Sequence, residues 1–546
     1  MDAQRARWST RLDPTLVERY TRSGAWNGRT LEDLARRRAA EHPRRTAIVD
    51  GELRLDFARL LAEAERVAAG LRDIGLPTGE VVAFQLPNWW EAAVVNLAAC
   101  LGGWVALPVV PIYREAELEI ILGDSRARVV FVPARFRNVD HPALIGAIRD
   151  RLPDLQLLVE VRGRGDGSAE ADFARLGVAA APWTQRTRSA DDVKLLLYTS
   201  GTTGRPKGVL HSHNTIMAEL DAVAAFWRVT ADDVVLMPSP VTHITGYLYA
   251  LEQVFTAGVR VVLMDRWDAA AAVALSEREH ATLSVAATPF LAEFVAELEA
   301  SHRCLPAFRI FASGGAPVPP EVVRRASRVL PEGLVCRVYG SSEAPTVTLG
   351  IDTPAERERG MHTDGRVVNH EVRIVDPVTG APLPADSEGE ITTRGPELML
   401  GYRRSEDTQA AFDADGYFLT GDLGVLGADG FLTITGRKKD LIIRGGEKIS
   451  PREMEDLLHT HPAVAEAAVV AMPHARLGET SFAWLVLRPG HALQFTELVA
   501  WLEQARIARQ KFPEGLAIVD ALPKTASGKV LKHVLRQRAA AHTAGS

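Results

Sequence analysis

Apolar segments with helical spacing alternate with short, continuously apolar segments through the first part of the chain, and this alternation limits the possible folds most. A helix is predicted over 57–74, because apolar residues recur at helical spacing between Asp56, a suitable N-cap, and Gly75, a helix terminator. Such alternation predicts α/β layers around a largely parallel sheet. Further helices are expected at 88–103 and 114–125, and buried strands at 80–86 and 127–133.

The alternation continues to about residue 315 and then gives way to a different pattern. Residues 161–190 interrupt it and are expected to form a surface excursion. Beyond residue 370, short β segments separated by Gly and Asp turns, such as EVRIVD, GEITTRG and GFLTITG, predict antiparallel structure. The strands expected before this change are VVLMPS (234–239), RVVLMD (260–265), ATLSVAAT (281–288) and RIFASGG (309–315).

The residues from 437 onward have a compact α+β pattern of their own. A chain of 546 residues exceeds what one hydrophobic core usually supports. We therefore expect a large α/β domain over 1–436, with layered sheets, helices and a β-rich subdomain, joined at a charged segment to a small α+β domain over 437–546. The elements expected in the small domain are a hairpin at 441–450, a helix opened by Pro451, strands at 464–473 and 481–490, and helices at 495–509 and 530–541.

Composition narrows the class of protein. Hydrophobic residues make up 47% and charged residues 24% of the chain, and the net charge is −6, which describes a soluble globular protein without a nucleic-acid partner. Cys100, Cys304 and Cys336 lack the spacing of disulfides or metal ligands and are expected to be core residues in a reducing compartment. Neither a signal peptide nor an 18-residue uncharged apolar segment is found, so we expect no transmembrane segment and a cytoplasmic location.

Residues 197–212, LYTSGTTGRPKGVLHS, combine glycines, hydroxyl residues and one lysine between two apolar runs. Glycine lets the backbone approach an anion, hydroxyls donate hydrogen bonds and lysine adds charge, so the loop suits a phosphate; a Gly/Thr-rich hairpin tip is the alternative. It is not a Walker P-loop, because proline precedes the lysine and glycine follows it. The flanks favour strand, loop, strand, with a helix beginning near Asn214. The candidate phosphate ligands are Thr199, Ser200, Gly201, Thr202, Thr203, Gly204 and Lys207.

The stretch YTSGTTGRPKG (198–208) resembles the signature loop of the AMP-forming adenylating enzymes, which include acyl-CoA synthetases, adenylation domains of peptide synthetases and beetle luciferases. The resemblance implies a large N-terminal domain, a hinge and a small mobile C-terminal domain. It also implies two half-reactions: a carboxylate attacks the α-phosphorus of Mg-ATP to give an acyl-adenylate and pyrophosphate, and a thiol then displaces AMP. Further segments in that family's order are YGSSEAP (339–345), TGDLG (420–424), GRKKDLIIRGGEKISP (436–451) and PKTASGKV (523–530).

The resemblance assigns roles to residues of the first half-reaction. Lys529 is the principal catalytic cation, because charge accumulating on phosphate oxygens needs electrostatic stabilisation, and Glu343 is the catalytic carboxylate that binds Mg²⁺. Tyr339 offers an aromatic face to adenine, while Asp422 and Arg437 bind the ribose. The other residues implied to contact ATP or AMP are Gly314, Gly315, Ala316, Gly340, Ser341 and Ser342. Ser342 replaces the family's usual Thr, so we expect the affinity for phosphate to be affected more than the ability to catalyse the reaction.

The resemblance also assigns residues to the second half-reaction. Lys439 occupies the family's hinge position, and Gly445, Gly446 and Lys448 lie in the segment that lines the pantetheine tunnel after the small domain turns. Glycine there lets a narrow thiol arm pass close to the backbone, although a tight hairpin turn would use the same glycines. ATP, Mg²⁺ and coenzyme A are therefore expected to bind.

The segment SPVTHITGYLYA (239–250) matches the region where the family holds its acyl group. His243 is a catalytic candidate that contacts the carboxylate, and Ile244, Gly246 and Tyr247 are expected to line a pocket for a hydrophobic acid. The resemblance is closest to medium-chain and alicyclic acyl-CoA ligases, so an AMP-forming acid:CoA ligase, monomeric or homodimeric, is the predicted function. The alternatives are an enzyme that loads a carrier protein, a non-catalytic AMP binder, and an enzyme efficient in only one half-reaction.

Overall fold

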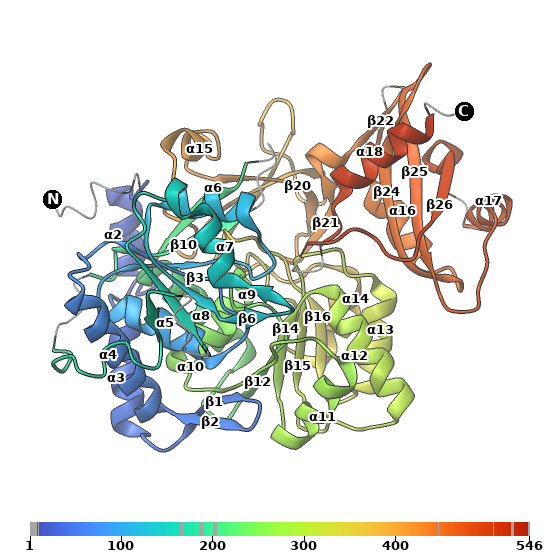
Figure 1. Cartoon of the computed structure of the whole chain (residues 1–546). Coiled ribbons are helices and arrows are strands. Elements are labelled where there is room, and N and C mark those ends of the chain that lie inside the picture. The colour runs from blue at the N-terminus through green and yellow to red at the C-terminus, as the bar shows by residue number, and fades with distance from the viewer. Residues whose placement is uncertain are drawn as a thin grey trace.

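The described residues fold into a large unit built on three main sheets, with a small two-stranded sheet beside them, and a smaller C-terminal unit built on its own sheet, as the computed structural model shows (Figure 1). Helices surround the two larger sheets, and the C-terminal unit stands to one side of them, joined through β21 (Leu432–Arg437) and the 3-10 turn Lys438–Asp440. The structure describes residues 8, 10–163, 169–184, 189–199, 205–445, 447–505, 507–525 and 529–543.

The first sheet has eight strands in the order β19-β11-β10-β4-β3-β5-β8-β9, and its β3, β4, β5 and β8 run parallel, as the alternating pattern predicted. The expected helix at 57–74 is α4 (Phe57–Asp73), whose N-cap Asp56 accepts a hydrogen bond from the Arg59 amide at 2.8 Å. The strands of this first sheet are β3 (Val81–Phe84), β4 (Val105–Pro108), β5 (Ala127–Pro133), β8 (Leu157–Val161), β9 (Ala171–Asp172), β10 (Val193–Thr199), β11 (Lys207–Ser212) and β19 (Gly401–Tyr402). Associated helices are α5 (Trp90–Leu101), α6 (Glu115–Ser125), α7 (His141–Ile148) and α8 (His213–Trp227).

The second sheet has seven strands in the order β16-β15-β14-β12-β13-β1-β2, parallel except for the β1–β2 pair. Its strands are β1 (Thr46–Asp50), β2 (Leu53–Asp56), β12 (Val234–Met237), β13 (Arg260–Leu263), β14 (Leu283–Ala286), β15 (Ile310–Ser313) and β16 (Leu334–Arg337). The helices around it include α11 (Ala269–Glu279), α12 (Thr288–Ser301), α13 (Pro320–Val329) and α14 (Arg357–His362). The strands expected between 234 and 315 are all confirmed.

The third sheet is antiparallel, as the short segments beyond residue 370 predicted. Its order is β17 (Glu371–Val375), β18 (Glu388–Arg394), β20 (Phe418–Leu426) and β21. In the β20–β21 pair, Asp422 lies opposite Arg437. This register brings two predicted site residues side by side next to the joint with the C-terminal unit.

The C-terminal unit has its own sheet and its own hydrophobic core. One of its helices, α17, ends five residues before the expected residue 509. Its elements are β22 (Ile442–Arg444), β23 (Glu447–Ile449), α16 (Pro451–Leu458), β24 (Val464–His474), β25 (Gly478–Leu487), α17 (Phe495–Gln504), β26 (Gly515–Ile518) and α18 (Lys532–Thr543). The other expected elements are confirmed, except that β25 ends three residues before the expected residue 490 and that β26 was not predicted.

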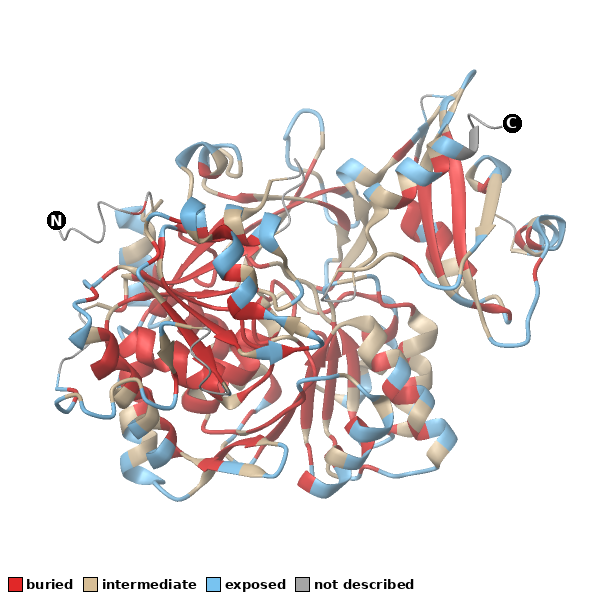
Figure 2. Cartoon of the chain, viewed as in Figure 1, coloured by how far each residue is buried: buried red, intermediate tan, exposed pale blue. Residues whose placement is uncertain are grey.

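Buried residues concentrate in the sheets and in α5, and a separate buried layer lies in the C-terminal unit (Figure 2). The cysteine expectation is wrong for Cys304, which is exposed, and right for Cys100 and Cys336, which are buried. The interruption at 161–190 is only partly a surface excursion, because Phe173 and Trp183 are buried. Within the described part of the chain, no helix has the length and apolar character needed to span a membrane.

Candidate active site

The strands on either side of the glycine-rich loop pair antiparallel, with Thr199 on β10 opposite Lys207 on β11. This confirms the two expected strands; five of the predicted phosphate ligands, Ser200, Gly201, Thr202, Thr203 and Gly204, lie outside the described residues. The Lys207 ammonium lies 3.3 Å from a carboxylate oxygen of Asp407 and 4.9 Å from the centre of the Tyr402 ring. An anion and an aromatic face therefore orient this lysine at the base of the loop.

Glu343 lies beside the same tyrosine. The Tyr402 hydroxyl donates to Glu343 Oε1 at 2.8 Å, and burial together with the Glu343 charge raises the pKa of Tyr402, so the hydroxyl stays a donor. Pairing of β19 with β11, Tyr402 opposite Val209, holds the ring in place. The described residues contain no cluster of three or more acidic, His or Cys ligands. A single carboxylate fits Mg²⁺, which binds proteins through few carboxylates and otherwise keeps water or substrate phosphates.

The segment that carries Glu343 is a tight turn that requires glycine at its start. A Cβ on Gly340 would lie 1.9 Å from the Pro345 carbonyl oxygen. Inside the turn the Ser341 amide donates to the Ala344 carbonyl at 2.8 Å, and the Ala344 amide donates to the Ser341 hydroxyl at 3.2 Å. These contacts fix the backbone on both sides of the predicted metal ligand.

His211 also supports this turn. It was not predicted as a site residue, because a histidine within an apolar strand segment carries no distinctive signal. Its Nε2 lies 2.8 Å from the Ser342 carbonyl oxygen, and its Nδ1 lies 3.1 Å from Thr215 Oγ1. Burial lowers the pKa of His211 to about 4, so the ring is neutral and Nε2 carries the proton donated to Ser342. The serine that departs from the family's usual Thr is thus restrained through its backbone.

Replacing His211 with leucine should reduce adenylate formation about tenfold, because the buried Ser342 carbonyl loses its donor next to Glu343. His211→Gln retains a donor near the position of Nε2 and should recover most of the rate. Pyrophosphate exchange into ATP would be measured at varied MgATP, beside thermal unfolding. Equal losses in both variants would show that the hydrogen bond is not the reason for the effect.

Asp422 is the centre of a second cluster. Its Oδ2 accepts a hydrogen bond from the Tyr339 hydroxyl at 2.7 Å, and its Oδ1 lies 2.7 Å from Arg437 Nε. Tyr339 follows β16, and a Cβ on Gly314, at the end of β15, would lie 2.4 Å from the Val338 carbonyl oxygen. Gly314 therefore lies against the backbone of Val338, the residue before Tyr339.

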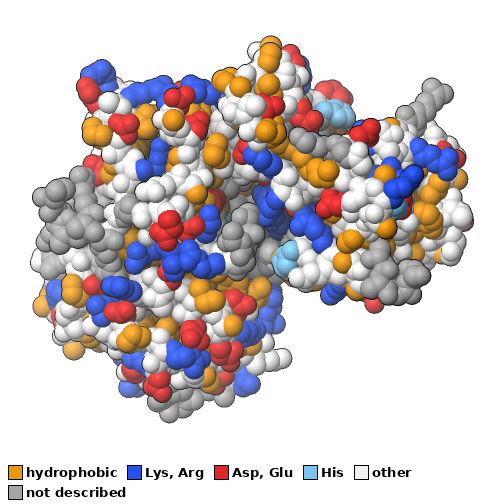
Figure 3. Space-filling model, turned by 90° about the horizontal axis from the view of Figure 1, so that it is seen from above, with side chains coloured by type: hydrophobic (Ala, Val, Ile, Leu, Met, Phe, Trp, Pro, Cys, Tyr) orange, Lys and Arg blue, Asp and Glu red, His pale blue; other side chains and the backbone are white. Residues whose placement is uncertain are grey.

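Lys529 reaches this second cluster from the C-terminal unit. Its backbone is held in a loop by Thr525, whose amide donates to the Lys529 carbonyl at 2.8 Å and whose hydroxyl accepts from the Lys529 amide at 3.1 Å. Burial, helped by the neighbouring Arg437 and opposed by Asp422, lowers the pKa of Lys529 to about 8. The structure thus brings the predicted cation close to the predicted ribose ligands. Figure 3 shows Lys and Arg side chains gathered where the two units face one another.

His243 is close to the same lysine. Burial, together with the Lys529 charge, lowers the pKa of His243 to about 4, so the ring is a neutral hydrogen-bonding group. His243 is the N-cap of the short helix α9 (Ile244–Gly246), and Lys439 lies in the 3-10 turn of the joint, where it also acts on Lys529. His243, Lys439 and Lys529, predicted from three separate segments, therefore gather at the junction of the two units.

The predicted acyl-pocket segment is anchored in the core. Ile244 and Tyr247 are buried, and the Tyr247 hydroxyl donates to Asn96 Oδ1 at 2.8 Å. After Gly246 the chain continues as a π-helix over Tyr247–Glu252, where Glu252 forms a buried ion pair with Lys194 at 2.7 Å. The segment is thus tied to the core through polar contacts, and the tyrosine hydroxyl is already used within the protein.

The predicted CoA-tunnel residues lie in the hairpin of β22 and β23. Gly445 is exposed in the turn, where its amide donates to the Leu477 carbonyl at 2.8 Å within the C-terminal unit. Gly446 lies outside the described residues, and Lys448 is on β23. Gly445 is therefore held by the backbone of the C-terminal unit itself.

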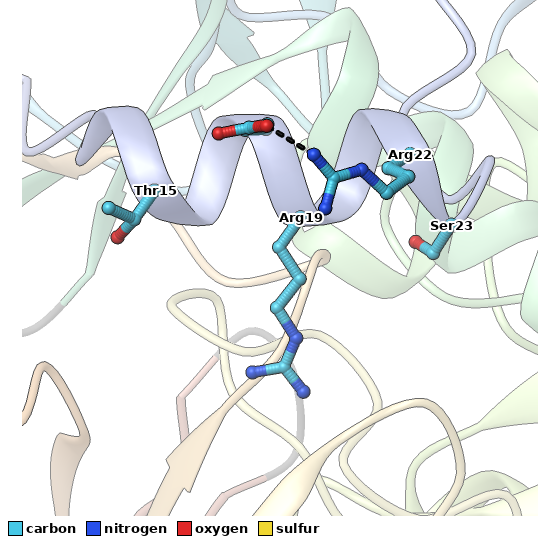
Figure 4. Close-up of a pocket in the computed structure, with 5 residues that line it drawn as sticks. Thr15, Arg19, Arg22 and Ser23 are labelled. Atoms are coloured by element: carbon cyan, nitrogen blue, oxygen red, sulfur yellow. Dashed lines mark hydrogen bonds and ion pairs between the residues drawn. The ribbon is translucent and has the colours of Figure 1, made fainter.

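A hollow elsewhere on the surface carries no comparable chemistry. It lies along one helix, α2 (Pro14–Arg22), in Figure 4, where Glu18 and Arg22 form an ion pair. Its lining residues are Thr15, Glu18, Arg19, Arg22 and Ser23. All five belong to one helix and its cap, and none belongs to a predicted site.

Comparison with known proteins agrees with this geometry. The AMP-binding enzyme family matches residues 35–403, and the AMP-binding enzyme C-terminal domain matches residues 453–529. A medium-chain fatty-acid–CoA ligase of Escherichia coli is 37% identical over 525 residues, covering 95% of this chain and 92% of that protein. A methyl-dioxo-octahydroindenyl-propanoyl:CoA ligase of Rhodococcus jostii is 33% identical, covering 93% and 98%. The crystal structure of ATP-bound MatB from Rhodopseudomonas palustris superposes with a TM-score of 0.83 at 29% identity, covering 94% and 99%.

Proposed function

The chain belongs to the AMP-binding enzyme family and is an AMP-forming acid–thiol ligase, and on that premise we propose that it converts a hydrophobic carboxylic acid into its CoA thioester. In the first step a carboxylate oxygen of the acid attacks the α-phosphorus of ATP, and the bond from that phosphorus to pyrophosphate breaks. In the second step the CoA thiolate attacks the acyl carbonyl, and AMP leaves with the electron pair of the broken bond.

The observation that supports this function best is the Asp422–Arg437 pair at 2.7 Å, whose two charges both act on the Lys529 ammonium of the C-terminal unit. Two cations and one carboxylate suit a nucleotide: the carboxylate accepts hydrogen bonds from ribose hydroxyls, and the cations stabilise negative charge that develops on phosphate oxygens. Lys207 and Lys529 approach the phosphates from different units. We infer that residues 1–436 and 437–546 act as separate domains and that Lys439 belongs to the hinge between them.

Glu343 is the residue we assign to Mg²⁺. The bound ion supplies charge neutralisation for the phosphates of ATP. Tyr402 orients one oxygen of Glu343, and His211 and Gly340 fix the backbone that carries it. Tyr339, beside Asp422, is the residue we assign to the adenine face.

The substrate we propose is a medium-chain or alicyclic acid. Ile244 and Tyr247 are buried apolar and aromatic residues, so we expect this segment to offer apolar side chains rather than a charge for a polar substrate. His243 is neutral and can donate one hydrogen bond to the substrate carboxylate. The two related CoA ligases act on a medium-chain fatty acid and on a bulky ring-bearing propanoate.

An acid panel with ATP and Mg²⁺ tests the proposal, with CoA or a carrier protein that bears a free pantetheine thiol as acceptor and products identified by mass spectrometry. Acyl-CoA from a hydrophobic acid is the expected product. Acyl-AMP without any acyl-CoA would instead indicate a carrier-loading enzyme. Absence of both acyl-AMP and pyrophosphate exchange across the panel would reject an adenylating function.

The loss of activity at alkaline pH should follow the deprotonation of Lys529. Its pKa lies near 8 in the free protein, so kcat/KM for pyrophosphate exchange is expected to fall as the pH rises through about 8 and the ammonium loses its proton. Asp422 and Asp440 oppose this loss, while Arg437 and Lys439 favour it. In Lys529→Arg the guanidinium stays charged, so the alkaline fall should disappear whatever rate remains. A fall that persists unchanged in this variant would assign it to another group.

A further inference from the structure

A cluster of buried charges joins the two units away from the nucleotide residues. Arg452, on α16 of the C-terminal unit, has Nη2 3.2 Å from Oδ1 and 3.3 Å from Oδ2 of Asp364 in the large unit. Arg337 on β16 binds the same carboxylate through two hydrogen bonds of 3.1 and 2.7 Å. The side chains of these three residues are 9%, 7% and 3% exposed, so the whole cluster is shielded from water.

The large unit does not need Arg452 to neutralise Asp364. Arg337 and Asp364 already balance each other, and Asp364 Oδ2 also accepts from the Ile434 amide on β21 at 2.8 Å. Arg452 is the third charge, and Asp456, 3.7 Å away on the same helix, is the fourth. Moving a charged side chain out of water costs free energy unless the charge is paired. Burying the Arg452 guanidinium at this position is therefore favourable only while α16 is docked on Asp364.

The same helix is connected to the catalytic loop. On α16, Glu455 accepts from the Val469 amide at 2.7 Å and lies 2.7 Å from the Lys532 ammonium at the start of α18. Lys532 is three residues beyond Lys529. A chain of contacts therefore runs from Asp364 through Arg452, α16 and Glu455 to the segment that carries Lys529.

We propose that Arg452 is a positioning residue for the first half-reaction: its ion pair with Asp364 holds the C-terminal unit in the arrangement that places Lys529 beside Asp422. This inference rests on the proposed function. It requires the pair to open before the C-terminal unit can turn for thiol transfer, so Arg452 favours adenylate formation over the second half-reaction.

Arg452→Met tests the proposal, because it keeps the length of the side chain and leaves the Arg337–Asp364 pair intact. Pyrophosphate exchange should fall roughly tenfold, while the transfer of a supplied acyl-AMP to CoA should stay the same or become faster. Arg452→Lys should recover part of the loss. Lys511→Met is the matched control, because Lys511 pairs with Glu453 on the same helix but within the C-terminal unit, and it should change neither half-reaction.

A distance measurement makes the test independent of any activity. Spin labels on the exposed Cys304 of the large unit and on Arg509→Cys, whose native side chain is 82% exposed, report the separation of the two units. Arg452→Met should broaden or shift this distribution, and Lys511→Met should not. An unchanged distribution, or equal losses in both half-reactions, would overturn the positioning role. A wild-type protein that adenylates no acid would reject the proposed function but leave the distance result valid.

Discussion

Lys529→Met is expected to reduce acyl-adenylate formation by about 10²- to 10³-fold, the usual cost of removing one group that stabilises transition-state charge. The ammonium is the cation that the C-terminal unit contributes beside Asp422 and Arg437. Transfer of a supplied acyl-AMP to CoA should change little, because in the proposed reaction that step follows pyrophosphate release and needs no cation on the departing phosphates. Pyrophosphate exchange and acyl-CoA formation from acyl-AMP, measured separately, distinguish these two expectations.

Lys524→Met is the matched control for this loss. Lys524 precedes the same loop, but its ammonium pairs with Glu466 at 2.6 Å within the C-terminal unit. Its replacement should leave both half-reactions near the wild-type rates, because partly exposed ion pairs contribute little. If Lys529→Met slowed thioester formation from acyl-AMP as strongly as adenylate formation, Lys529 would not act in the first half-reaction alone.

The fold was predictable wherever it depends on local patterns. The helix at 57–74 and the strand at 127–133 appear with the expected bounds within a residue or two, since apolar periodicity and capping residues act over a few positions. The prediction that Cys304 lies in the core was wrong, because no periodic apolar pattern around this small residue decides whether it is buried. The order of strands within each sheet depends on long-range pairing and was not specified by the sequence pattern.

In the candidate site, too, some residues were predictable from the sequence and others were not. Glu343, Asp422 and Lys529 lie in motifs, and their positions were predicted from the family resemblance. Their supporting partners were not: Tyr402 is 59 residues from Glu343, and His211 is 131 residues from Ser342. The Arg452–Asp364 pair spans 88 residues and two units. Such partners are ordinary polar residues in sequence, and only the folded backbone brings them next to the motifs.

Glu343→Gln should lower adenylate formation by about 10²-fold, because the amide keeps the size of the side chain but removes the charge that a hard divalent cation requires. The Tyr402 hydroxyl can still donate to the amide oxygen, so the turn should keep its structure and thermal unfolding should change little. Tyr402→Phe removes only the orienting hydrogen bond, so the expected loss is smaller, about three- to tenfold.

Calorimetric titration with a non-hydrolysable ATP analogue separates the metal from the rest of the site. In wild-type protein, Mg²⁺ should tighten binding relative to the same titration in EDTA. In Glu343→Gln that gain should largely disappear, while binding in EDTA stays the same, because Asp422, Arg437 and Tyr339 are unchanged. An Mg²⁺-dependent gain equal to that of the wild type would exclude Glu343 as the ligand and direct the search to the other carboxylate near Lys207, Asp407, which lies 3.3 Å from its ammonium.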